Sequence, residues 1–106
     1  VPVAALPAHK TPEVVKALRK ALPQFIPGDN VMKTGLDNIG AIFHPAVTVL
    51  NAGRIESTFG DFDYYTEGIT PSVAAILEKM DQERVHVAGS LGFRAMTARA
   101  GLSVGL

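Results

Sequence analysis

The side chain best suited to acid–base chemistry in this 106-residue chain lies in one apolar stretch, LDNIGAIFHPAVTVLN, residues 36–51. His44 stands there with Pro45 directly behind it, and it is the only titratable residue between Asp37 and Arg54. An imidazole that titrates near neutral pH can act as a general acid or base. It can also be a core histidine whose ring nitrogens are both hydrogen bonded, and spacing alone favours this second interpretation.

Pro45 affects the backbone that would carry this histidine. Proline has no N–H, so the Ala41 carbonyl loses its helical partner and the ring crowds the preceding turn. We therefore expect a bend between Ala41 and Pro45 that re-aims His44. Asn38 lies six residues before His44, about 120° away around a straight helix, and such a bend would bring the two closer. An amide at Asn38 can equally bond a neighbouring backbone group.

The apolar spacing of this stretch predicts a helix that begins at Thr34 or Asp37. Asn51 and the following Ala52-Gly53 are expected to end it, because glycine is favoured just past a helix. With almost no charge, the helix should be buried nearly all round. Its apolar residues are Leu36, Ile39, Ile42, Phe43, Val47 and Leu50.

Residues 54–69 are predicted to form a loop with two aromatic anchors, Tyr64 and Tyr65. Adjacent side chains of an extended segment point in opposite directions. One tyrosine is therefore expected to face the core and the other a cleft.

A second helix is predicted from Pro71 to about Leu91, with Thr70 as its N-cap. Arg84 falls on the apolar stripe of this helix, four residues after Met80. A charge in that position needs a partner. Asp81 is the local candidate, and Glu67 would have to reach it from the loop.

The start of the chain has the pattern of a short strand and then an amphipathic helix, which is typical of α/β folds. The strand, VPVAALP, is closed by Pro7, and Thr11 is the expected N-cap of a helix from about Pro12 to Leu22. The segment PQFIPGDN at 23–30 is predicted to be a boundary. The expected apolar stripe of the helix is Val14, Val15, Leu18 and Leu22.

The composition excludes several classes of function. Ten basic residues balance ten acidic ones, so no global field would attract nucleic acid or a membrane surface. No apolar run approaches the ~20 residues of a membrane span. The lack of cysteine suits a reducing cytoplasm. His9 and His86 are expected at the surface, and three histidines so far apart predict no metal site.

Several motifs occur together in a fixed order. Asn38 is followed by His44-Pro45, Leu50-Asn51, the Tyr-Tyr loop, EGITPS at 67–72 and Asp-x-Glu-Arg at 81–84. Residues 30–92 closely resemble the helical domain of the octopine/nopaline (opine) dehydrogenases. The resemblance implies a mainly α fold, with an incomplete helical domain at 30–106. Residues 1–29 would be a strand–helix remnant of an α/β nucleotide-binding domain and a connector, in a fragment of a longer chain.

The resemblance also implies a reaction. Such enzymes use NAD or NADP to condense an amino acid reductively with a 2-oxo acid, and they run the reverse reaction. The catalytic histidine of the family corresponds to His44, and its asparagine to Asn38, which would position substrate or nicotinamide. Tyr65, Glu67 and Thr70 are expected to line the substrate cleft. The cofactor loop and the carboxylate that orients the histidine would lie outside this chain, so the chain alone should be inactive.

Two other functions stay open at this point. A related reductase of 2-hydroxy or branched keto acids would share the helical domain without using an amine. A non-catalytic helical module for dimerisation or docking would leave His44 buried and inert. The choice between NAD and NADP, the two substrates and the oligomeric state, including a homodimer, do not follow from the residues.

Overall fold

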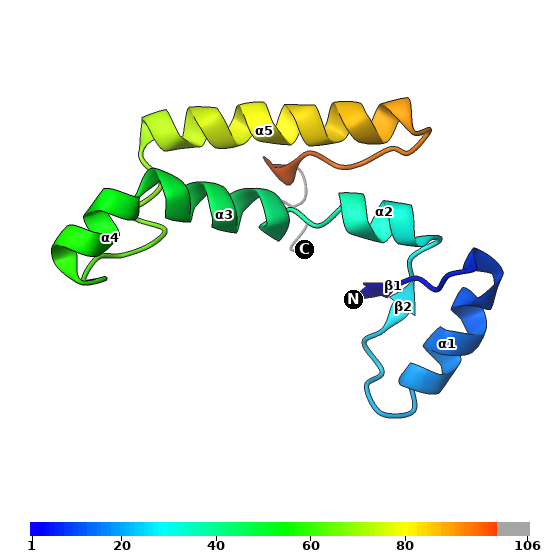
Figure 1. Cartoon of the computed structure of the whole chain (residues 1–106). Helices are drawn as coiled ribbons and strands as arrows, with labels where there is room; N and C mark the ends of the chain where they lie inside the picture. Colours follow the sequence, from blue (N-terminus) through cyan, green and yellow to red (C-terminus); the bar gives the residue numbers. More distant parts are fainter. Residues whose placement is uncertain (100–106) are drawn as a thin grey trace.

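A computed structural model describes residues 1–99, and it shows a mainly helical chain, as predicted, with a short parallel sheet (Figure 1). In chain order its elements are β1 (Pro2–Val3), the 3-10 helix η1 (Ala8–Lys10), α1 (Thr11–Leu18), β2 (Ile26–Pro27), α2 (Val31–Leu36), α3 (Gly40–Leu50), α4 (Ala52–Thr58) and α5 (Pro71–Ser90). The last seven residues of the predicted helical domain, 100–106, lie outside the described residues.

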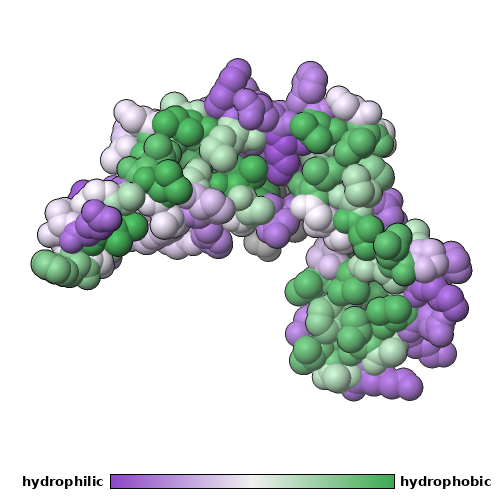
Figure 2. Space-filling view, in the orientation of Figure 1, coloured by the Kyte–Doolittle hydropathy of each residue, from purple (hydrophilic) through white to green (hydrophobic). Residues whose placement is uncertain are grey.

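Residues 1–29 form an N-terminal unit around the two-stranded sheet. β1 and β2 are parallel, with Pro2 opposite Ile26 and Val3 opposite Pro27. The predicted strand is therefore present, although short, and the predicted boundary at 23–30 contains its partner strand. Hydrophobic residues gather over the face of this unit in Figure 2, and Leu6 is 83% exposed.

The start of α1 differs from the prediction. Thr11 is the first residue of the helix, not its N-cap, and Lys10 occupies the cap position. The threonine hydroxyl does not cap the helix. It accepts a hydrogen bond from Ala5 N–H at 3.0 Å. The helix ends at Leu18, and only Val15 of its predicted apolar stripe is buried.

The helix predicted around His44 is two helices. α2 is capped by Asn30, whose side chain accepts from Lys33 N–H at 3.0 Å, and it ends at Leu36. The Arg84 guanidinium donates to the Leu36 carbonyl. The last carbonyls of a helix have no partner within the helix, so this side chain satisfies one of them. α3 then runs unbroken from Gly40 through Pro45, and the break lies upstream of the expected bend.

The prediction of a loop from residue 54 is wrong in its first part. α4 follows α3 directly after Asn51, and Gly53 lies inside it instead of ending α3. The left-handed conformation occurs at Phe59 and Gly60, with φ of 53° and 80°. α3 does end where predicted, at Leu50 with Asn51 as its C-cap, but the left-handed residues follow α4 instead of α3.

The core lies where α3 packs against α5 (Figure 1). Its buried residues are Ala46, Val47 and Leu77, and the partly buried hydrophobics around them are Phe43, Tyr64, Ile69, Val73 and Met80. The prediction that α3 is buried nearly all round is wrong, because only one of its faces meets α5. Val49 on another face is 72% exposed. Within residues 1–99, none of the helices has the length and apolar character required to cross a bilayer.

α5 confirms the prediction for the last helix. The Thr70 side chain accepts from Val73 N–H at 3.3 Å, as an N-cap does. Arg84 is buried, and its partner is Asp81: Nε and one terminal nitrogen lie 3.0 and 2.9 Å from Asp81 Oδ1. Arg84 also donates to the Met96 carbonyl, and Ala98 N–H donates to Asp81 Oδ2 at 2.7 Å. This pair therefore joins α5 to both α2 and the segment after α5.

Candidate functional site

His44 lies on the exposed side of α3. Its Nε2 atom is 3.1 Å from the Tyr65 hydroxyl. The interpretation of His44 as a buried core histidine is therefore wrong, because the core-facing positions of α3 are occupied by Ala46 and Val47. An exposed imidazole with one hydrogen-bonded nitrogen is available for proton transfer.

One tyrosine faces the core, as predicted, and the other is exposed; that it faces a cleft stays a prediction. Tyr64 is half-buried against the core, and Tyr65 is 60% exposed and reaches the imidazole. Their rings meet edge to face, with centroids 5.1 Å apart and planes at 81°. An edge-to-face contact is a favourable aromatic geometry. Tyr64 thus supports the ring that contacts His44.

Two hydroxyl groups converge on the backbone of His44. Tyr64 Oη donates to the His44 carbonyl at 2.8 Å, and Thr48 Oγ1 donates to the same carbonyl at 2.8 Å. The two hydroxyl oxygens lie 3.0 Å apart. Both the backbone and the ring of His44 are therefore tied to the loop that carries Tyr64 and Tyr65.

Asn38 lies near the same imidazole. A methyl group placed on Gly40 would be 3.3 Å from Asn38 Oδ1 and 3.6 Å from both Cε1 and Nδ1 of His44. The amide and the ring therefore lie on the same side of the start of α3. Asn38 is exposed, in the break between α2 and α3. Pro45 lies inside α3, one residue after His44.

A buried amide fixes the loop against α3. Asn51 Nδ2 donates to the Val47 carbonyl at 2.8 Å and to the Gly68 carbonyl at 2.9 Å. Gly68 is buried, and a Cβ there would lie 2.2 Å from the Tyr64 carbonyl oxygen. Asn51, which is predicted to serve the end of its helix, therefore also holds the tyrosine loop.

Two of the predicted cleft residues have structural partners. Glu67 accepts from Arg54 at 2.6 Å through Oε1 and from Asp63 N–H at 2.6 Å through Oε2. Thr70 caps α5. Among the described residues neither forms a hydrogen bond with His44. Of the predicted site residues, Tyr65 contacts the imidazole, and Asn38 lies on the same side of the start of α3. Substrate contacts for Glu67 and Thr70 remain predictions.

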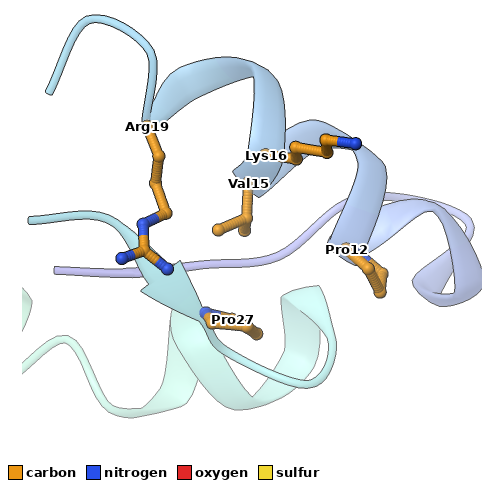
Figure 3. A pocket seen from close by; sticks show the side chains of 5 residues that line it. All are labelled: Pro12, Val15, Lys16, Arg19 and Pro27. Atoms are coloured by element: carbon orange, nitrogen blue, oxygen red, sulfur yellow. The ribbon is translucent and has the colours of Figure 1, made fainter. Parts of the chain in front are cut away.

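Other candidate sites lie away from His44. His9 and His86 are both exposed, as predicted. Within residues 1–99, no group of histidine and carboxylate side chains could hold a metal ion. A pocket of about 400 Å³ in the N-terminal unit lies between α1 and β2, lined by Pro12, Val15, Lys16, Arg19 and Pro27 (Figure 3).

A second pocket, of about 460 Å³, lies against α5. It is lined by residues of α3, α5 and the segment at 97–99, including Phe43, Leu77 and Asp81. His44 does not line it. The exposed imidazole therefore lies outside both of these pockets.

Sequence reasoning missed the hydroxyls of Thr48 and Tyr64. Thr48 lies four residues after His44, a spacing at which a threonine in a helix commonly bonds the earlier carbonyl, so this contact carried a local signal. Tyr64 is 20 residues from His44, and its contact depends on how the loop folds back. No local pattern reveals it.

The model of one protein family matches residues 27–104. Its description is NAD/NADP octopine/nopaline dehydrogenase, alpha-helical domain. The chain belongs to this family.

An opine dehydrogenase from Arthrobacter sp. (strain 1C) is 46% identical over 85 residues, which cover 80% of this chain and 23% of that protein. The family resemblance seen in the motifs is confirmed. The chain thus spans less than a quarter of this opine dehydrogenase.

Proposed function

We propose that this chain is part of a longer opine dehydrogenase, a cytoplasmic oxidoreductase that condenses an amino acid with a 2-oxo acid and reduces the product with NAD(P)H. Residues 30–106 would belong to its helical domain, and residues 1–29 would end its nucleotide-binding domain. The family match and the 46% identity to an opine dehydrogenase support this proposal.

The observation that carries the proposal is the exposed His44 imidazole, with Nε2 3.1 Å from Tyr65 and Asn38 nearby. When the amine adds to the 2-oxo carbonyl, the oxygen must leave as water, and this step needs a proton. His44 would donate that proton, and in the reverse direction it would accept one from water. Asn38 and the Tyr65 hydroxyl would orient the oxygen by hydrogen bonds.

The described residues do not fit a dinucleotide site by themselves. Gly89 and Gly92 flank the end of α5, not a turn between a strand and a helix, and a phosphate-binding glycine turn needs that setting. The cofactor would therefore be held by parts of the protein outside this chain. The role of this chain is to present the proton donor and its hydrogen-bonding neighbours.

The test is the substrate requirement of the full-length protein. Oxidation of NADH or NADPH is followed with a 2-oxo acid alone and with the same acid plus a panel of amino acids. We expect turnover only when both are present. Equal rates without the amine would contradict the proposal and indicate a keto acid reductase. The isolated 106-residue chain is the control and should show no turnover.

A further inference from the structure

Two side chains outside the predicted site act on the backbone of His44, and they enter from different elements. Thr48 is on α3, one turn after the histidine, while Tyr64 comes from the loop before α5. Both donate to the His44 carbonyl at 2.8 Å. In a regular helix a carbonyl accepts one bond, from the residue four positions later. The additional donors therefore hold this turn of α3 more firmly than helix formation requires.

This reinforcement falls where the helix is weakest. Pro45 cannot donate to the Ala41 carbonyl, so the turn that carries His44 lacks one backbone bond. Tyr64 and Thr48 bond the turn from its exposed side. The Tyr64 ring also supports Tyr65 edge to face, and Tyr65 contacts Nε2 of the imidazole. Tyr64 therefore contacts the backbone of His44 directly and its imidazole through Tyr65.

We propose that Tyr64 and Thr48 are positioning residues for His44, which fix its carbonyl and, through Tyr65, the direction of its imidazole. This inference rests on the proposed function in one respect, that the aim of His44 matters for turnover. A shift of about 1 Å in a catalytic group can lower a rate by as much as a hundredfold. Neither hydroxyl is required to touch substrate, so their loss should affect kcat more than KM.

The experiment uses Tyr64→Phe, Thr48→Val and the double variant in the full-length protein. Phenylalanine keeps the ring against Tyr65, and valine keeps the shape of threonine. We expect kcat to fall about tenfold in each single variant, with KM for both substrates within about threefold. Because both hydroxyls act on one carbonyl, the double variant should lose clearly less than the product of the two effects. Thr48→Ser should restore most of the rate.

Thr58→Val is the matched control. Thr58 Oγ1 donates to the Arg54 carbonyl at 2.6 Å in α4, the same kind of bond in a helix that does not carry His44. Its turnover should stay within about twofold of the parent. If Tyr64→Phe and Thr48→Val lose no more than Thr58→Val while His44→Gln loses its turnover, the positioning role is overturned.

A second readout does not depend on turnover. Nuclear Overhauser contacts between the His44 and Tyr65 rings are measured in histidine-labelled protein, with His44→Gln to assign the signal. We expect these contacts to weaken in Tyr64→Phe and in Thr48→Val and to persist in Thr58→Val. Unchanged ring contacts would overturn the inference. Loss of the contacts together with full turnover in His44→Gln would instead uphold the positioning and defeat the proposed function.

Discussion

The N-terminal unit at 1–29 and the helical unit formed by α3, the tyrosine loop and α5 are organised differently. In the N-terminal unit only Thr11 and Val15 are buried, and Leu6 and other large hydrophobics are exposed. The helical unit has a continuous cluster around Val47, which is fully buried. Among residues 1–99, the side chains that hydrogen bond to His44 all come from positions 48–65. The hydrogen bonds that hold His44 should therefore depend on the helical unit alone.

Among the variants considered, Gly68→Ala should destabilise the helical unit most strongly. The new methyl group would lie 2.2 Å from the Tyr64 carbonyl oxygen, so the backbone of the tyrosine loop must move. We expect a loss of about 3 kcal/mol in the free energy of unfolding, measured by urea denaturation. Gly53→Ala in α4 is the control, since a methyl group there meets no atom within 4 Å. A Gly68→Ala variant as stable as Gly53→Ala would show that the loop is not packed as described.

The two elements that the sequence predicts well are governed by local signals. Thr70-Pro71 begins α5, and Asp81 pairs with Arg84 three residues away, because caps and helical ion pairs involve neighbours in the sequence. At the break between α2 and α3, Arg84 bonds the carbonyl of Leu36, 48 residues away. A contact of that range leaves no trace in local spacing, which therefore predicts one long helix.

The candidate site was predictable to a similar degree. His44, Asn38 and Tyr65 stand in motifs that resemble those of the opine dehydrogenases. The structure places Tyr65 against the imidazole and Asn38 on the same side of the start of α3. The exposure of His44 was not predictable, because an apolar helix gives no indication of how many of its faces meet a partner. The Glu67 pair with Arg54 also joins residues 13 positions apart, and it depends on the fold of the loop.

A pair of valine variants sharpens the comparison between the two units. Val15→Ala and Val47→Ala each remove buried methyl groups, and each should cost about 1.5 kcal/mol of unfolding free energy. Val47→Ala should also weaken the Nuclear Overhauser contacts between the His44 and Tyr65 rings, because it loosens the packing beneath them. Val15→Ala should leave those contacts unchanged. Equal weakening in both variants would show that the site depends on the N-terminal unit.

Gly40→Ala should have the smallest effect on stability, about 0.5 kcal/mol or less, because alanine suits a helix better than glycine does. Its methyl group would nevertheless lie 3.3 Å from Asn38 Oδ1 and beside the imidazole. We expect turnover of the full-length protein to fall about tenfold as Asn38 shifts. Gly35→Ala in α2 is the control, since a methyl group there meets no atom within 4 Å. Equal turnover in both variants would mean that Asn38 and His44 do not act together.

The central claim is that the exposed imidazole of His44 transfers the proton, and kinetics of His44→Gln in the full-length protein test it most directly. His86→Gln is the matched control, because His86 is also exposed but lies on α5. We predict that His44→Gln lowers kcat at least about a hundredfold, the usual scale of general acid–base catalysis, while His86→Gln stays near the parent rate. A folded His44→Gln enzyme that condenses amino acid and 2-oxo acid as fast as His86→Gln would contradict the account.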